Sequence, residues 1–130
     1  MIDRIVISSD DQARYNDPLT EQAFLHFVTD FKPQTAVKNG DLVDLQALGK
    51  FRVSLFERQS FVPDIEAGRA ILANLRSALP DRARLVLTAG NHEERLVNYL
   101  KDQAAELEGV PGLTLEEQLD LSSLGVEFVG

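Results

Sequence analysis

The 130-residue chain contains no cysteine and few basic residues. Without thiol groups it forms no disulfide framework and no thiolate metal site, so a metal ion would have to be held by carboxylate, amide or imidazole groups. The 13 Lys and Arg residues stand against 21 Asp and Glu residues, which gives a net charge of −8. This balance argues against a broad nucleic-acid-binding or acidic-membrane surface, because such surfaces need clustered cations.

The chain also lacks a long apolar run. No stretch approaches the roughly 20 residues that a membrane span requires. The N-terminus has neither the basic segment nor the cleavage site of a signal peptide. We therefore expect a cytoplasmic protein without membrane contact. The length, the 44% hydrophobic content and the absence of a linker-like stretch predict a single domain over residues 1–130.

Short apolar runs alternate with helical patterns along the chain. The composition predicts strands at 4–9, 35–38, 84–88 and 126–129. The first of them, being short and β-branched, is expected to be buried on both faces. Apolar spacing predicts helices at 17–32, 64–79, 91–100 and 114–119, with an irregular helix over 42–61. Asp17 and Asp64 are the expected N-caps of the first two helices, and Thr114 with Glu117 forms a capping box.

This alternation predicts an α/β fold, with a mainly parallel sheet and helices on both faces. Ligands of open parallel sheets bind at the carboxyl ends of the strands. Asp10, Asp41 and Asn91 each follow a predicted strand and are therefore expected at one edge of the sheet. Gly40 and Gly90 are expected to let the backbone turn sharply there.

The three loops after these strands offer hard oxygen ligands and one imidazole. Such a set suits Mg²⁺, Mn²⁺ or Fe, and the imidazole of His92 extends the choice to Zn²⁺ or Ni²⁺. Each loop alone is equally compatible with an ordinary turn or helix cap. His26 is expected at the surface of the first helix. The ordered set of loops is therefore more informative than any single one.

The residues SDxQ at 9–12, NGDLVD at 39–44 and GNHE at 90–93 resemble the first three motifs of the calcineurin-like metallophosphoesterases. The order is the family's, the resemblance spans residues 2–100, and it is greatest to small bacterial and phage members. It implies that the chain is an incomplete half of a four-layer αββα fold, truncated at its C-terminus.

The resemblance also implies a set of metal ligands. Asp10 would bind a first ion, with Gln12 at the position where the family usually has a histidine. Asp41 would bridge two ions, and Asn91 would bind the second. The expected cofactor is Mn²⁺, with Mg²⁺, Zn²⁺, Fe and Ni²⁺ as alternatives and at most two ions in a complete site.

The implied reaction is hydrolysis of a phosphomonoester or phosphodiester by a metal-activated hydroxide. His92 would be the catalytic residue at the scissile phosphate, and Asp44 and Glu93 would support the ligands from behind. The family's later histidine ligands have no counterpart, because no histidine follows His92. We therefore expect a homodimer or a second polypeptide to complete the site, and the chain alone to be inactive.

Two alternatives remain open at this stage. The chain would act as a non-catalytic metal-binding or assembly module if it kept only the family's sheet. The length and the pair Asp10 and Asp11 after the first strand also suggest a receiver-like phosphoacceptor domain. That domain would need a phosphorylatable aspartate after a middle strand and a late Lys-Pro pair. Neither occurs where it is needed.

Overall fold

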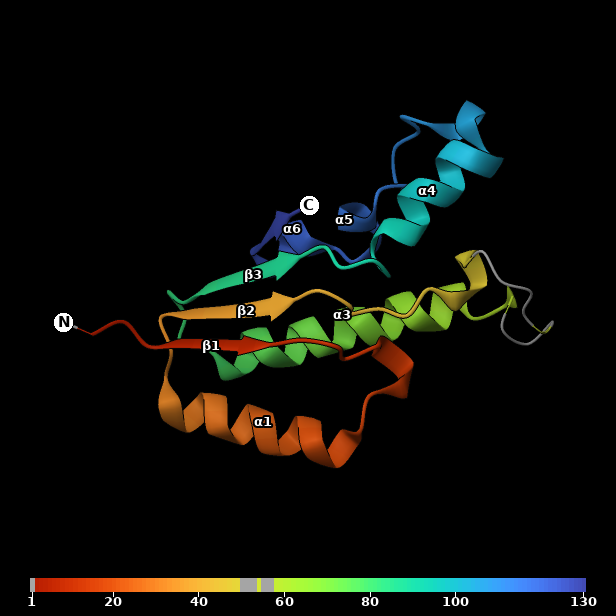
Figure 1. The fold of residues 1–130 in the computed structure, drawn as a ribbon. Coiled ribbons are helices and arrows are strands. Elements are labelled where there is room, and N and C mark those ends of the chain that lie inside the picture. Colours follow the sequence, from red (N-terminus) through yellow and green to blue (C-terminus); the bar gives the residue numbers. More distant parts are fainter. Residues whose placement is uncertain (1, 50–53, 55–57) are drawn as a thin grey trace.

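A computed structural model describes residues 2–49, 54 and 58–130. It contains a four-stranded, fully parallel sheet in the order β1-β2-β3-β4 (Figure 1). The strands are β1 (Ile5–Ser8), β2 (Thr35–Asn39), β3 (Arg84–Thr88) and β4 (Val126–Val129). The predicted α/β class and the parallel sheet with flanking helices are confirmed. The predicted cover of both faces is not found among the described residues, since Ile5 and Ile7 of β1 are exposed.

Helices and 3-10 turns connect the strands. They are η1 (Ala13–Tyr15), α1 (Pro18–Phe31), η2 (Gln46–Leu48), α3 (Phe61–Ala78), α4 (Glu94–Gln103), η3 (Ala105–Leu107), α5 (Leu115–Gln118) and α6 (Leu121–Leu124). The predicted caps at Asp17 and at Thr114 with Glu117 are confirmed, since their side chains bond to backbone groups of the first turn. None of the helices in the described part of the chain is both long and apolar enough to cross a bilayer.

Three helix predictions need correction. Helix α3 begins at Phe61 after Ser60, so Asp64 lies inside the first turn and is not its N-cap. Pro63 misled the prediction because proline is tolerated throughout a first turn. Helix α4 begins at Glu94, and the preceding residues 91–93 form a turn. Of the predicted irregular helix at 42–61, residues 42–49 contain only the turn η2, and residues 50–53 and 55–57 lie outside the described part.

The sequential strand order determines where the helices lie. Right-handed crossovers that always move to the next strand in the same direction place their helices on the same face. In agreement, α3 contacts both α1 and α6, and α3 passes behind β1 and β2 in Figure 1. The side chains of Ala36, Leu85 and Leu87 point into the core on this side and are fully or almost fully buried.

Within the described residues, the opposite face of the sheet is open at its two edge strands, although Val86 on the central strand β3 is only 9% exposed. On β1, Ile5 is 55% and Ile7 is 65% exposed, and Val129 on β4 is also exposed. The prediction that strand 4–9 is buried on both faces is therefore wrong, because β1 is an edge strand with helical cover on one side. The order also differs from the 2-1-3-4-5 order of the flavodoxin-like fold, which does not favour the receiver reading.

This asymmetry gives a prediction for two strand residues. Ile7→Thr keeps β-branching on the open face and should change the free energy of unfolding by less than about 0.5 kcal/mol. Leu87→Ala, on the buried face, should cost about 2–5 kcal/mol because it leaves a cavity. Urea unfolding followed by circular dichroism measures both. Similar losses for the two variants would contradict the open face.

Candidate functional site

The loop after β1 is bonded to the loop after β2. Backbone N–H groups of Asp10, Gln12 and Ala13 donate to the carbonyls of three successive residues, at N···O distances of 3.2, 2.9 and 2.7 Å respectively. The three acceptors are Gly40, Asp41 and Leu42. The first loop therefore continues alongside the second beyond the end of the sheet, which brings two predicted metal-binding loops together.

The carboxylate of Glu93 ties the second loop to the third. One oxygen accepts the N–H groups of Asp41 and Gly90, each at 2.8 Å. The other accepts the N–H of Val43 at 3.2 Å. Glu93 is only 1% exposed, so its charge is stabilised by backbone donors in place of water. The expected supporting role of Glu93 now has an atomic description.

The two glycines at the site serve different purposes. Gly40 has a φ of +80°, so it provides the turn expected of it. The prediction for Gly90 is wrong in its reason, because the structure records no positive φ there. A Cβ at Gly90 would lie 2.3 Å from Oδ1 of Asp41 and 2.8 Å from its backbone nitrogen. Close approach of the second loop therefore requires glycine at position 90.

His92 is fixed between the two predicted acidic residues of the second loop. Its backbone N–H donates to Oδ1 of Asp41 at 3.1 Å. Its Nδ1 lies 3.0 Å from the carbonyl oxygen of Asp44 and 3.3 Å from the Asp44 carboxylate. Because a carbonyl oxygen only accepts, Nδ1 carries the proton and Nε2 is the nitrogen left for other partners. The guanidinium of Arg95 also donates to the Asp44 carbonyl, at 2.7 Å.

Asp64 supports the second loop from behind, a role that the sequence did not indicate. Its buried carboxylate accepts from the backbone N–H of Leu45 at 3.2 Å and from Nε of Arg14 at 2.9 Å. Burial raises the pKa of Asp64, and the charge and hydrogen bond of Arg14 partly oppose this rise. The network joins α3 to the first two loops.

Lys38 anchors the first loop and was likewise not predicted. Its ammonium group lies 2.8 Å from Oδ1 of Asp11 and over the ring of Phe24, and the residue is only 3% exposed. A lysine in a strand reads as solvent-facing from sequence alone, so no local signal identified this ion pair. Lys38 thus holds Oδ1 of Asp11, while Oδ2 is buried without a hydrogen-bond partner among the described residues.

The side chains of the predicted metal ligands are less tightly organised than the backbone around them. Asp10 and Asn91 are exposed, and Gln12 and Asp41 are half-buried. The hydroxyl of Ser9 donates to Oδ2 of Asp10 at 2.6 Å. The described residues contain no group of three or more His, Cys, Asp or Glu arranged to hold a metal ion. His26 is exposed on α1, as expected.

The chain is similar to two phage proteins, each called Gene 54 protein. It is 30% identical to that of Mycobacterium phage L5 over 133 residues, which cover 99% of this chain and 51% of the relative. It is 31% identical to that of Mycobacterium phage D29 over 130 residues, which cover 97% of this chain and 50% of the relative. The chain thus spans about half the length of these relatives. No family model and no solved structure matches it.

The Glu93 carboxylate gives the sharpest stability prediction. In Glu93→Gln, the amide nitrogen would face backbone N–H groups that need an acceptor, so we expect a loss of about 2–4 kcal/mol in the free energy of unfolding. Glu94→Gln is the matched control, because Glu94 is exposed and should tolerate the change. Chemical unfolding of both variants measures the difference. Equal stability of the two would show that the three hydrogen bonds contribute nothing.

The raised pKa of Asp64 gives a pH-dependent prediction. The pKa of Asp64 is higher in the folded protein than in the unfolded chain, where it is near 3.8. The free energy of unfolding therefore falls as the pH rises from about 3.8 to the pKa of the folded state, because the folded protein resists losing this proton. Asp64→Asn removes the titration. The cost of the substitution should therefore be smaller at about pH 7 than at about pH 4. Thermal unfolding at both pH values measures this cost, with Asp30→Asn as the control because Asp30 is exposed. A larger cost at about pH 7 than at about pH 4 would contradict the argument from burial.

Proposed function

We propose that this chain supplies the metal-binding and proton-donating half of a phosphoesterase site, and that the site hydrolyses a phosphomonoester or phosphodiester. The observation that carries this proposal is the junction of three loops at the carboxyl edge of the sheet, with His92 fixed through Nδ1. The proposed ligands Asp10, Gln12 and Asn91 follow from their places in these loops, as does the bridging role of Asp41.

The donor set fits a hard divalent ion. Within the described residues, Oδ1 of Asp10 and Oδ2 of Asp41 make no hydrogen bond, so both remain available. Two carboxylates and two amides are oxygen donors suited to Mn²⁺, Mg²⁺ or Fe, whereas Zn²⁺ and Ni²⁺ would gain from additional imidazole. With only two anionic ligands, we expect one ion to bind weakly and a second to need further ligands. When bound, such ions polarise a phosphoryl oxygen and lower the pKa of water.

His92 is placed to act on the leaving group. Its Nδ1–H donates to the Asp44 carbonyl, and a carboxylate oxygen of Asp44 lies 3.3 Å from the same nitrogen. When the ring is protonated on both nitrogens, Nε2–H can donate its proton to the departing oxygen, or hydrogen-bond to the charge that develops on the phosphoryl oxygens. Asp44 and Glu93 then position His92 without contacting the substrate.

A second candidate is a non-catalytic assembly module of the same origin. The exposed aliphatic side chains of Ile5, Ile7 and Val129 favour it, because parallel sheets are normally covered on both faces. A second copy of the chain, or a segment corresponding to the part of the phage relatives that this chain does not match, would cover this face. The same partner would supply the ligands that the catalytic proposal needs.

The cytoplasmic location also remains a prediction.

Metal binding provides the test. Calorimetric titration with Mn²⁺ should detect binding that Asp41→Asn weakens about a hundredfold or more, since even outer partners of metal ligands are worth about 10–100-fold. Asparagine suits this position because it tolerates the positive φ of 55° found at Asp41. Asp81→Asn, exposed at the opposite end of β3, is the matched control.

Three outcomes are informative. Binding lost only in Asp41→Asn supports the half-site, and hydrolysis of a chromogenic phosphodiester in the same sample would indicate that a partner completes it. Mn²⁺ binding without hydrolysis by the chain alone agrees with both the half-site and the assembly module, whereas hydrolysis would refute the assembly module. Equal titrations for the wild type and Asp41→Asn would refute the proposed ligand set.

A further inference from the structure

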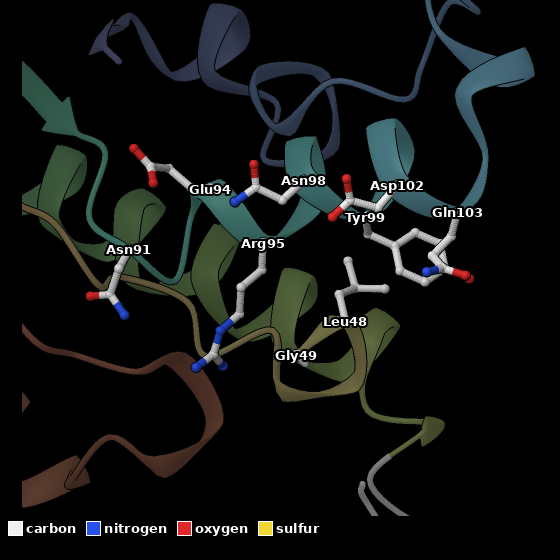
Figure 2. Close-up of a pocket in the computed structure, with 9 residues that line it drawn as sticks. All are labelled: Leu48, Gly49, Asn91, Glu94, Arg95, Asn98, Tyr99, Asp102 and Gln103. Atoms are coloured by element: carbon white, nitrogen blue, oxygen red, sulfur yellow. The ribbon is translucent and has the colours of Figure 1, made fainter. Parts of the chain in front are cut away.

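A cavity of about 480 Å³ lies between η2 and α4, and Asn91, one of the four proposed metal ligands, lines it. Asn91 and Arg95 lie toward one end, and Leu48, Tyr99 and Gln103 lie toward the other (Figure 2). The volume falls in the range typical of small-molecule sites. The cavity therefore extends from the loop that carries the proposed ligand Asn91 to a region lined by an aliphatic, an aromatic and an amide side chain.

Arg95 provides the cationic end of the cavity. Its guanidinium has five N–H donors, and Nη1 uses one of them on the Asp44 carbonyl. Within residues 2–49, 54 and 58–130, no carboxylate forms an ion pair with Arg95. Because its charge is unpaired there, the side chain can bind an anionic group of a ligand while Asp44 holds it in place.

Tyr99 provides a flat surface at the other end. It is 41% exposed, and it lies four residues after Arg95 and four before Gln103, which places the three on one side of α4 about one helical turn apart. Leu48 of η2 borders the same space. An aromatic ring beside an aliphatic side chain and an amide suits a planar base, which stacks on the ring and bonds through its edge.

The charges around the cavity limit how many phosphates a ligand can carry. Glu94 and Asp102 also line it, and the Glu94 carboxylate points away from the Arg95 guanidinium in Figure 2. One arginine among two carboxylates can accommodate a single phosphate group better than a polyphosphate chain. The net charge of −8 likewise disfavours a long nucleic acid.

We propose that this cavity binds a nucleoside monophosphate, with the phosphate at Arg95 and Asn91 and the base against Tyr99. This inference rests on the proposed function, because it names the phosphomonoester that the same site would hydrolyse. Arg95 would position the phosphate, and Tyr99 would determine the preference for a nucleoside leaving group.

The test compares fragments of the ligand with variants of the residues that would bind each fragment. Affinities of AMP, adenosine and ribose 5-phosphate are measured by ligand-observed NMR in buffer containing EDTA, so that no metal ion is needed. Arg95→Gln should lower the affinity for AMP about tenfold and leave the affinity for adenosine unchanged, since only AMP carries the phosphate. Tyr99→Ala should lower the affinities for AMP and adenosine about tenfold and leave the affinity for ribose 5-phosphate unchanged, since only the first two carry a base.

Two exposed positions provide controls. Arg82→Gln removes an arginine in the turn before β3, and Val97→Ala shortens an exposed residue of α4 outside the cavity lining; both should bind AMP like the wild type. Equal affinity for AMP and ribose 5-phosphate, or an Arg95→Gln effect on adenosine, would overturn the proposal. If a 5′-phosphorylated oligonucleotide bound more tightly than AMP, the proposal of a free nucleotide would be overturned and the ligand would be the end of a nucleic acid.

The result is separable from the metal test. AMP binding in EDTA together with no Mn²⁺ binding would remove the phosphoesterase proposal and leave a nucleotide-binding site. Mn²⁺ binding that depends on Asp41, together with no preference for AMP over ribose 5-phosphate, would leave the proposed function and remove this inference.

Discussion

The buried carboxylate of Glu93 is the interaction on which the candidate site depends. It accepts N–H groups from Asp41, Val43 and Gly90, and so joins the loops that follow β2 and β3. A buried carboxylate without such donors would cost several kcal/mol. The loop after β1 is in turn bonded along the second loop, so its position depends on Glu93 indirectly. His92, one residue earlier in the chain, takes its place between Asp41 and Asp44 as a consequence.

The same loops concentrate backbone strain. Of the seven described non-glycine residues with positive φ, five lie in the first two loops: Asp10, Gln12, Ala13, Asp41 and Leu45. The left-handed region costs roughly 1–2 kcal/mol for most residues, and aspartate tolerates it better than alanine or leucine. Such strain persists only where surrounding contacts determine the backbone, and it is common at functional sites. Here those contacts are the bonds to Glu93 and Asp64 and the ladder between the two loops.

Local signals in the sequence predicted the strands and the three loops well. Runs such as 84–88 are rich in aliphatic residues and end at a polar or glycine residue, so both the strand and its carboxyl end could be located. Exposure of Ile5 and Ile7 could not be predicted, because strand composition does not reveal the order of strands in a sheet. Asp64 and Lys38 were missed for a similar reason: their partners, Arg14 and Asp11, are distant in sequence.

The sequential strand order also bears on how the chain can fold. Each strand pairs with the strand that precedes it in the chain, so no later segment has to insert between two strands that have already paired. The sheet can therefore grow one unit at a time as the polypeptide leaves the ribosome, with each completed βαβ unit acting as the template for the next. Loop closure then involves only one connection at a time, which limits the entropy lost before each new contact forms.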